Sequence, residues 1–128
     1  MRFLRIITLV AVLFCLACSG QQRQPVTLSI DSIGMVTLAL DQELVLRLSS
    51  NHTTGYRWHA KKLPAMLQQV GEAVYTRDAA TSGAVGAGGM EEWRFKAVAR
   101  GTGTLELVYQ REWEKGPIKK RSYNLSVW

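Results

Sequence analysis

The chain has 128 residues, a formal net charge of +6, 47% hydrophobic residues, two cysteines and two histidines. Because both cysteines, Cys15 and Cys18, stand near the N-terminus, the rest of the chain cannot form an internal disulfide and depends on apolar burial for its stability. The sequence contains no set of Cys, His and carboxylate ligands at the short spacing of a zinc site, and no nucleophile-elbow pattern. We therefore expect a protein that is not an enzyme and binds no cofactor.

The start of the chain is typical of an export signal. Arg2 and Arg5 precede an apolar run from Ile6 to Ala17 in which Thr8 is the only polar residue. This run is shorter than the roughly 20 residues that a membrane-spanning helix needs. A charged start and a short apolar centre are instead the features of a signal peptide. We expect residues 1–17 to be removed on export.

The residues around Cys18 resemble the cleavage site of a bacterial lipoprotein. Small Ala17 precedes the cysteine, and the polar stretch from Ser19 to Gln22 follows it. The resemblance implies that Cys18 is lipidated and becomes the mature N-terminus, with residues 18–25 as a tether between membrane and domain. Serine rather than aspartate after the cysteine implies the outer membrane, with the domain in the periplasm or on the surface. An ordinary secretory signal cleaved nearby is the alternative.

Beyond the tether, apolar residues recur at every second position, which is typical of half-buried β-strands. The best helical candidate, Leu63–Val70, contains Pro64 and ends before Gly71 after one or two turns. Residues 26–128 therefore predict one all-β domain, a β-sandwich of seven or eight short strands. The alternating sets are Val36, Leu38 and Leu40; Leu44, Leu46 and Leu48; Tyr56, Trp58 and Ala60; Trp93, Phe95 and Ala97; Leu105, Leu107 and Tyr109; and Tyr123, Leu125 and Val127, with Val70 and Val74-Tyr75 as shorter candidates.

Three connections between these segments are recognisable by composition. Arg100-Gly101-Thr102-Gly103 and Glu114-Lys115-Gly116-Pro117 each predict a tight hairpin between consecutive strands. The stretch Thr76–Gly89 is rich in Ala, Gly and Ser and has almost no core-forming side chain. Because a long loop in a small domain usually has a function, this stretch predicts a functional loop.

The segment Asn51-His52-Thr53-Thr54-Gly55-Tyr56 predicts a stiff, blunt turn between two strands. Asn51 can bond to the backbone two residues on, and the β-branched threonines are restricted about the first side-chain torsion. Gly55 permits a backbone geometry that other residues avoid. Such a wedge can fill an enzyme cleft, because preorganisation lowers the entropy cost of binding. A purely structural turn is the alternative.

Two later segments have residue types that are common at contact surfaces. Gly86, Gly88 and Gly89 allow the backbone to approach a partner closely, and the residues after them lack the pattern of a phosphate-binding loop. Arg111 and Trp113 are of the types enriched at interface hot spots, and their polar surroundings favour contact over core. The alternatives are a hairpin without a binding role for the glycines and a core position for Trp113.

In this order, the three motifs resemble the binding loops of the chagasin-like (ICP-type) inhibitors of papain-family cysteine peptidases. In that family the loops read Asn-Pro-Thr-Thr-Gly-aromatic, Gly-x-Gly-Gly and Arg-Pro-aromatic, so that His52 and Glu112 replace two prolines here. The resemblance implies an immunoglobulin-like fold and reversible, non-covalent, competitive inhibition in which three loops occlude the active-site cleft. It places Thr53 nearest the catalytic cysteine. The implied peptidase-binding residues are Asn51, His52, Thr53, Thr54, Gly55, Tyr56, Gly86, Gly88, Gly89, Arg111 and Trp113.

The basic residues of the chain gather late, at Lys115, Lys119, Lys120 and Arg121. Because Glu112 and Glu114 are interspersed and no basic helix is predicted, we expect a solvated hairpin and no nucleic-acid partner. We expect a monomer whose partners are a papain-like peptidase and, through its lipid, a membrane. The alternative function is a non-catalytic binding module of the cell envelope that takes a glycan or a protein through the same loops.

Overall fold

The computed structural model describes residues 22–29, 34–79 and 86–128. The predicted signal peptide, residues 1–17, and the predicted lipidation site Cys18 lie outside the described residues. In the described ranges, no helix is long and apolar enough to cross a membrane. These ranges contain nine strands and one 3₁₀ turn: β1 (Val26–Ser29), β2 (Met35–Leu38), β3 (Glu43–Ser50), η1 (His52–Thr54), β4 (Arg57–Lys62), β5 (Leu67–Gln69), β6 (Val74–Arg77), β7 (Gly89–Ala97), β8 (Gly101–Gln110) and β9 (Lys119–Val127).

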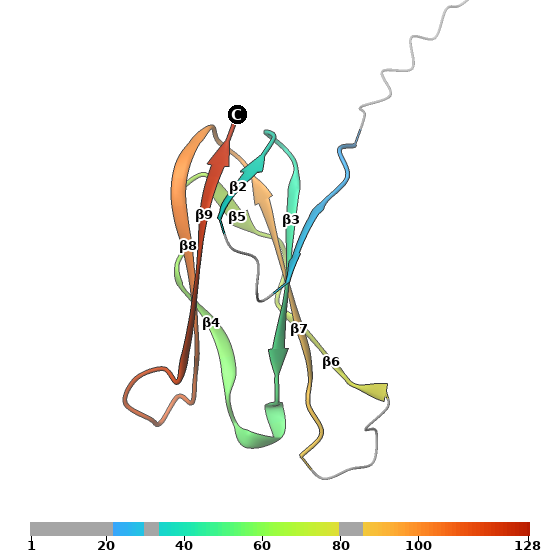
Figure 1. Cartoon of the computed structure of the whole chain (residues 1–128), viewed down its shortest axis with the longest axis vertical. Coiled ribbons are helices and arrows are strands. Elements are labelled where there is room, and N and C mark those ends of the chain that lie inside the picture. The colour runs from blue at the N-terminus through green and yellow to red at the C-terminus, as the bar shows by residue number, and fades with distance from the viewer. Residues whose placement is uncertain (1–21, 30–33, 80–85) are drawn as a thin grey trace, which may run out of the picture.

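The strands form two sheets, which lie face to face in Figure 1. One sheet has the order β1-β3-β7-β5, with β6 also paired to β7, and the other has the order β2-β9-β8-β4. Strand β7 has two short neighbours along its length, because β6 pairs with Gly89–Glu92 and β5 pairs with Phe95–Ala97. The predicted all-β sandwich is confirmed, with nine strands in the described ranges rather than seven or eight; β1 is the strand for which no alternating set was identified.

The core lies between the sheets and consists mainly of the alternating residues that the sequence predicts; Met66 and Leu67 are additions, and Val36 and Tyr56 are only partly buried. Each fully buried leucine or phenylalanine stabilises the fold by about 1.5–3 kcal/mol. This burial closes the sandwich without a disulfide. The core residues are Leu44, Leu46, Leu48, Leu67, Trp93, Phe95 and Ala97 from one sheet, Leu38, Trp58, Leu105, Leu107, Tyr109, Tyr123, Leu125 and Val127 from the other, and Met66 beside them.

Three local predictions are wrong. Strands β7 and β8 belong to different sheets, so no hairpin joins them: residues 98–100 cross between the sheets, and Gly101–Gly103 are already the first residues of β8. Leu40 is not part of β2, because the chain turns at Asp41, which has a φ of 66°, and leaves Leu40 37% exposed. Ala60 is exposed as well, since the pairing of β4 with β8 shifts register there.

The predicted long loop is shorter than expected. Thr76 and Arg77 end β6 and pair with Met90 and Gly89 at the start of β7, so both ends of the Thr76–Gly89 stretch are regular strand. The second prediction is confirmed as a hairpin, because β8 and β9 pair antiparallel, but its connection covers residues 111–118 and is longer than the predicted tight turn.

Three connections lie together at one end of the sandwich, at the bottom of Figure 1. They are β3–β4 through η1, the described residues of β6–β7 (78–79 and 86–88) and β8–β9. The tether, residues 22–25, and the C-terminus lie at the opposite end. The fold therefore gathers at one end the three motifs that the sequence spreads over 63 positions, from Asn51 to Trp113.

Candidate functional site

The first loop is held by its own side chains. Asn51 caps η1: its side-chain oxygen accepts from the Thr53 backbone N–H (3.2 Å) and from the Thr53 hydroxyl (2.6 Å). The Thr54 hydroxyl donates to the Asn51 carbonyl (2.6 Å). Gly55, with a φ of 81°, ends the turn in the left-handed region, where glycine has no steric penalty. The result is a short, internally bonded wedge with exposed Thr53 and Thr54.

The first loop also bonds directly to the third. Arg111 donates from Nε to the Thr54 carbonyl at 2.7 Å, and its guanidinium lies 4.2 Å from the centre of the Tyr56 ring. The Trp113 indole, also from the third loop, covers Gly55, so that a Cβ at this glycine would lie 2.6 Å from Cη2 of the ring. These contacts make one surface from two segments more than fifty residues apart.

Glu114 links the same two loops and was not predicted as a site residue. Its carboxylate accepts from Arg111 Nη1 at 2.7 Å and from the Tyr56 hydroxyl at 2.9 Å. The bond from Arg111, followed by the one from Tyr56, lowers the pKa of Glu114 below its usual value. The same carboxylate raises the pKa values of Tyr56 and Arg111. Glu114 is therefore charged at neutral pH and neutralises Arg111.

The second loop contacts the first through its backbone. The Asn51 side-chain amide donates to the Gly86 carbonyl at 2.9 Å. Gly86 has a φ of 85°. Gly88 lies close to the backbone of Ser50, because a Cβ built on this glycine would be 3.8 Å from the Ser50 carbonyl oxygen. Gly89 is different, since it is buried in β7 with the Thr76 carbonyl and the Tyr75 ring in the space of a side chain. Glycine is therefore required at this position by packing within the sheet and not by a binding role.

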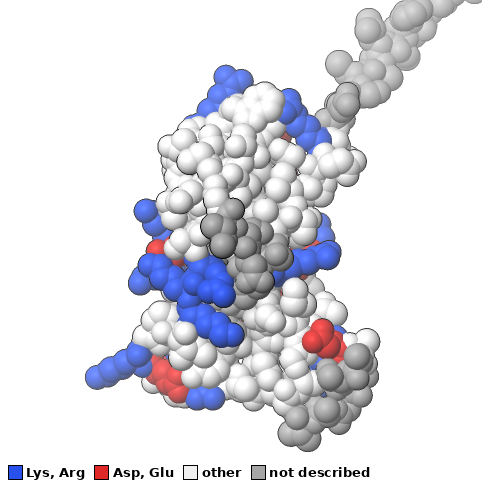
Figure 2. Space-filling view, viewed as in Figure 1, with Lys and Arg blue, Asp and Glu red and all other residues white. Residues whose placement is uncertain are grey.

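Trp113 is the large apolar side chain that stands out at this end of the molecule. It is 72% exposed and is therefore not part of the core. Both signs of charge occur at the loop end in the view of Figure 2, whereas Lys and Arg gather mainly in a band across the middle of the sandwich. The loop end therefore presents an aromatic ring and hydroxyl groups with charges of both signs, not a single-sign field.

Beneath the first loop lies a buried carboxylate that the sequence analysis missed. Glu91 on β7 is 3% exposed and accepts from His52 Nε2 at 2.8 Å. A signal was available: Glu91 continues the inward-facing set of Trp93, Phe95 and Ala97 by one step, and a carboxylate in a core position needs partners. The His52 side chain is thus held by a hydrogen bond to a buried carboxylate.

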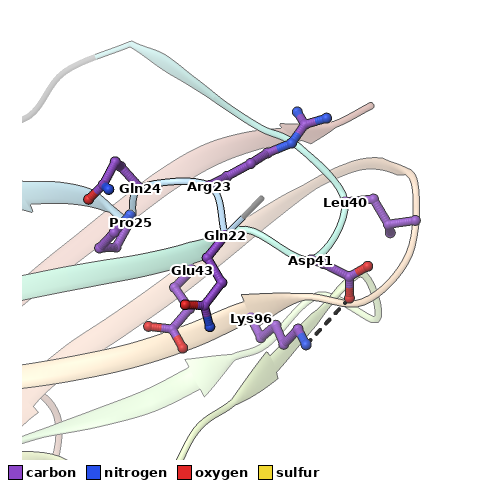
Figure 3. Close-up of a pocket in the computed structure, with 8 residues that line it drawn as sticks. All are labelled: Gln22, Arg23, Gln24, Pro25, Leu40, Asp41, Glu43 and Lys96. Atoms are coloured by element: carbon purple, nitrogen blue, oxygen red, sulfur yellow. Dashed lines mark ion pairs between the residues drawn. The ribbon is translucent and has the colours of Figure 1, made fainter. Parts of the chain in front are cut away.

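A surface hollow in the described part of the chain lies away from the loops. It forms where the tether passes the turn between β2 and β3, and Asp41 and Lys96 form an ion pair of 3.4 Å at its edge (Figure 3). Within the described ranges, no group of three His, Cys, Asp or Glu residues is placed to hold a metal ion. The hollow is lined by Gln22, Arg23, Gln24, Pro25, Leu40, Asp41, Glu43 and Lys96.

Several solved structures share this fold. The cysteine protease inhibitor EhICP2 from Entamoeba histolytica superposes with a TM-score of 0.72 at 23% identity, over 82% of this chain and 96% of that one. The solution structure of amebosin gives 0.63 at 26% identity, over 82% and 97%. PbICP-C, solved in complex with falcipain-2, gives 0.56 at 14% identity, over 80% and 99%.

Sequence comparison identifies the family. The chain is 30% identical over 90 residues to Amoebiasin-2 of Entamoeba histolytica, which covers 70% of this chain and 72% of that protein. Residues 37–127, well over half of the chain, match the model of the family described as Chagasin family peptidase inhibitor I42. This match confirms the resemblance indicated by the three motifs: the chain belongs to the chagasin family, whose members are peptidase inhibitors and not enzymes.

Proposed function

We propose that this protein is a reversible, non-covalent, competitive inhibitor of papain-like cysteine peptidases and that its three loops occlude the active-site cleft. The observation that carries the proposal is the direct bonding of the loops to one another at one end of the sandwich. Arg111 bonds to Thr54, and Asn51 bonds to Gly86. A surface assembled before binding avoids much of the entropy cost of ordering separate loops.

The first loop is the segment that enters the cleft, with exposed Thr53 at its centre. Peptide cleavage requires a backbone carbonyl that is free to align with the nucleophile. In this loop the Asn51 carbonyl accepts from Thr54, the His52 carbonyl accepts from the Gly55 N–H, and the Thr54 carbonyl accepts from Arg111. Because these carbonyls are held by bonds within the loop and by Arg111 of the third loop, the wedge resists the rearrangement that cleavage needs and remains intact.

Gly86 and Gly88 on one side and Arg111 and Trp113 on the other flank this wedge and contact the walls of the cleft. Related inhibitors indicate the class of partner, since EhICP2 is described as a cysteine protease inhibitor and PbICP-C was solved with falcipain-2. Interfaces of this kind bury about 800 Å² on each partner, mostly around aromatic and arginine anchors. Trp113 and Arg111 have that chemistry.

The position of the exposed aromatic rings favours this function over a glycan-binding module. Among the aromatic residues in the described ranges, only Trp113 and Trp128 are exposed. Trp113 lies in the β8–β9 connection, and Trp128 follows the last strand at the far end. A glycan site on a sandwich usually recruits aromatic side chains from a sheet face, and neither ring lies there.

The test is titration of the mature domain against papain with a fluorogenic substrate at several substrate concentrations. We expect competitive, reversible inhibition at nanomolar or lower concentration, with the inhibitor uncut after prolonged incubation. A protein that left papain and related cathepsins fully active at micromolar concentration would contradict the proposal. Screening of glycans and envelope proteins would then be the next experiment.

We further propose that the inhibitor is exported and anchored to the outer membrane through a lipid on Cys18. The tether supports this arrangement, because residues 22–25 join the domain at the end opposite the loops (Figure 1). The seven residues between Cys18 and Val26 span at most about 25 Å. The loops would therefore face away from the membrane. Metabolic labelling with palmitate tests this, and Cys18→Ser should abolish both the label and membrane association.

A further inference from the structure

We infer that Glu91 is the positioning residue of the first loop and that it acts through His52. The inference rests on the proposed inhibitory function for its effect on binding, but its structural part stands alone. Glu91 and Ser50 are the buried polar or charged residues of the described ranges, and they bond to each other, so the polar part of the core is concentrated beneath this loop.

The Glu91 carboxylate is surrounded by donors. Oε1 accepts from the Ser50 hydroxyl at 2.6 Å, from His52 Nε2 at 2.8 Å and, more weakly, from the Trp58 backbone N–H at 3.4 Å. Oε2 accepts from Trp93 Nε1 at 3.2 Å. A glutamine in either orientation of its amide would turn an N–H toward one of these donors. Only a carboxylate can accept hydrogen bonds at both of these positions.

The histidine is fixed from three directions. Arg57 Nη1 lies 2.9 Å from Nδ1 of His52, and a guanidinium can only donate, so Nδ1 accepts and the ring proton is on Nε2, from which it is donated to Glu91. The ring also stacks on Tyr75 with centroids 3.8 Å apart and planes 13° apart. The charged or titratable groups that face the imidazole are therefore Glu91, Arg57 and Tyr75.

Fixing this ring fixes the start of the wedge. His52 is the first residue of η1, and its carbonyl accepts the Gly55 N–H that closes the turn at 3.1 Å. The family pattern has proline here, and proline restrains the backbone through its own ring. Histidine does not, so in this chain the restraint comes from the side chain and its bond to Glu91.

A double-mutant cycle tests the coupling. Inhibition constants against papain are compared for the wild type, Glu91→Gln, His52→Pro and the double variant. We expect Glu91→Gln to weaken inhibition about 10-fold when His52 is present, and less than about 2-fold in the His52→Pro background, where the link is already replaced. An equal loss in both backgrounds, or no loss in either, would overturn the inference.

A second measurement needs no peptidase. Backbone ¹⁵N relaxation of residues 51–56 in the free protein should show order parameters near 0.85 in the wild type, falling toward 0.6 in Glu91→Gln. Ser50→Ala is the matched control, because it removes a donor to the same oxygen and leaves the histidine link. An equal fall of the order parameters in Ser50→Ala, or no fall in Glu91→Gln, would refute the positioning role.

His52→Ala serves the same purpose should Glu91→Gln fail to fold, since it removes the link and leaves the core carboxylate in place. It should loosen residues 51–56 as Glu91→Gln does, and a loop that stayed ordered would overturn the inference. The two measurements also separate two failures. A wild-type protein that does not inhibit papain refutes the proposed function, whereas the relaxation data still decide whether Glu91 positions the loop.

Discussion

Gly55 and Trp113 are in such close contact that a side chain at position 55 would collide with the indole ring. A Cβ built on Gly55 would lie 2.6 Å from Cη2 and 3.2 Å from Cζ2 of the indole. Gly55 also has a φ of 81°, a region that other residues rarely adopt. Two independent requirements therefore select glycine here, and one of them is a contact between two of the proposed binding loops.

Gly55→Ala should accordingly damage both the turn and the loop-to-loop contact. The added methyl group must displace the Trp113 ring or distort the wedge, while the left-handed backbone costs roughly 1 kcal/mol in addition. We expect papain inhibition to weaken by about 10-fold or more. The inhibition constant and the free energy of unfolding, measured on the same sample, check this.

Gly71→Ala is the control for that experiment. Gly71 has a similar φ of 67°, but nothing lies within 4 Å of a Cβ built there. It should lose a similar amount of stability from the backbone alone and inhibit papain normally. If both alanine variants inhibited normally, the contact between Gly55 and Trp113 would have no part in binding.

Trp113→Ala should weaken papain binding by roughly 2–4 kcal/mol, or about 30- to 1000-fold. Because the ring is 72% exposed, the free energy of unfolding should stay nearly unchanged. Trp128→Ala removes a second exposed tryptophan, 61% exposed, at the opposite end and should leave inhibition unaffected. Unfolding of the Trp113 variant would instead mean that the ring supports the fold.

The period-two pattern predicted the core well, because one face of each long strand is buried. Leu44, Leu46 and Leu48 are all fully buried, as their alternation indicates. The pattern reports that a face is covered but not which strand lies beside it. The residues Arg100–Gly103 therefore resembled a hairpin turn, although the chain crosses to the other sheet at residues 98–100 and Gly101–Gly103 begin β8.

The sequence predicted which residues make up the candidate site, but it did not predict the contacts among them. The motifs identify Asn51–Tyr56 and Arg111, but the bond from Arg111 to Thr54 joins residues 57 positions apart and depends on how the sheets are ordered. Glu114 escaped notice because its neighbours suggested an ordinary solvated turn. Its role follows only from the positions of Arg111 and Tyr56, which the fold brings to either side of it.

The bonding of Glu114 predicts how the loops respond to acid. Arg111 and then Tyr56 lower the pKa of this carboxyl in the folded protein. A lowered pKa means that the stabilising contribution is complete above the usual value of 4.5 and is lost as the pH falls through the lowered value. The link between the loops should thus be intact from neutral pH to about pH 5.

Titration of the Glu114 side-chain carboxyl by ¹³C NMR measures this directly. We expect its midpoint to lie below 4.5 and the Arg111 side-chain signals to move with the same midpoint. In Arg111→Gln the midpoint should rise, because the first cause of the lowered pKa is removed. A midpoint at the usual glutamate value in the wild type would show that the Arg111–Glu114 bond is not maintained in solution.

Arg111→Lys should weaken papain inhibition about 10-fold even though it keeps the charge. The guanidinium bonds to the Thr54 carbonyl through Nε and to Glu114 through Nη1 while it covers the Tyr56 ring. A lysine ammonium has its donors on one atom and lacks the planar fork, so it cannot reproduce both bonds together with the contact over the Tyr56 ring. The inhibition constant checks this, with Arg100→Lys, at an exposed arginine outside the loops, as the control. Equal inhibition by the wild type and Arg111→Lys would mean that only the charge at this position matters, and not the planar fork that joins the first loop to the third.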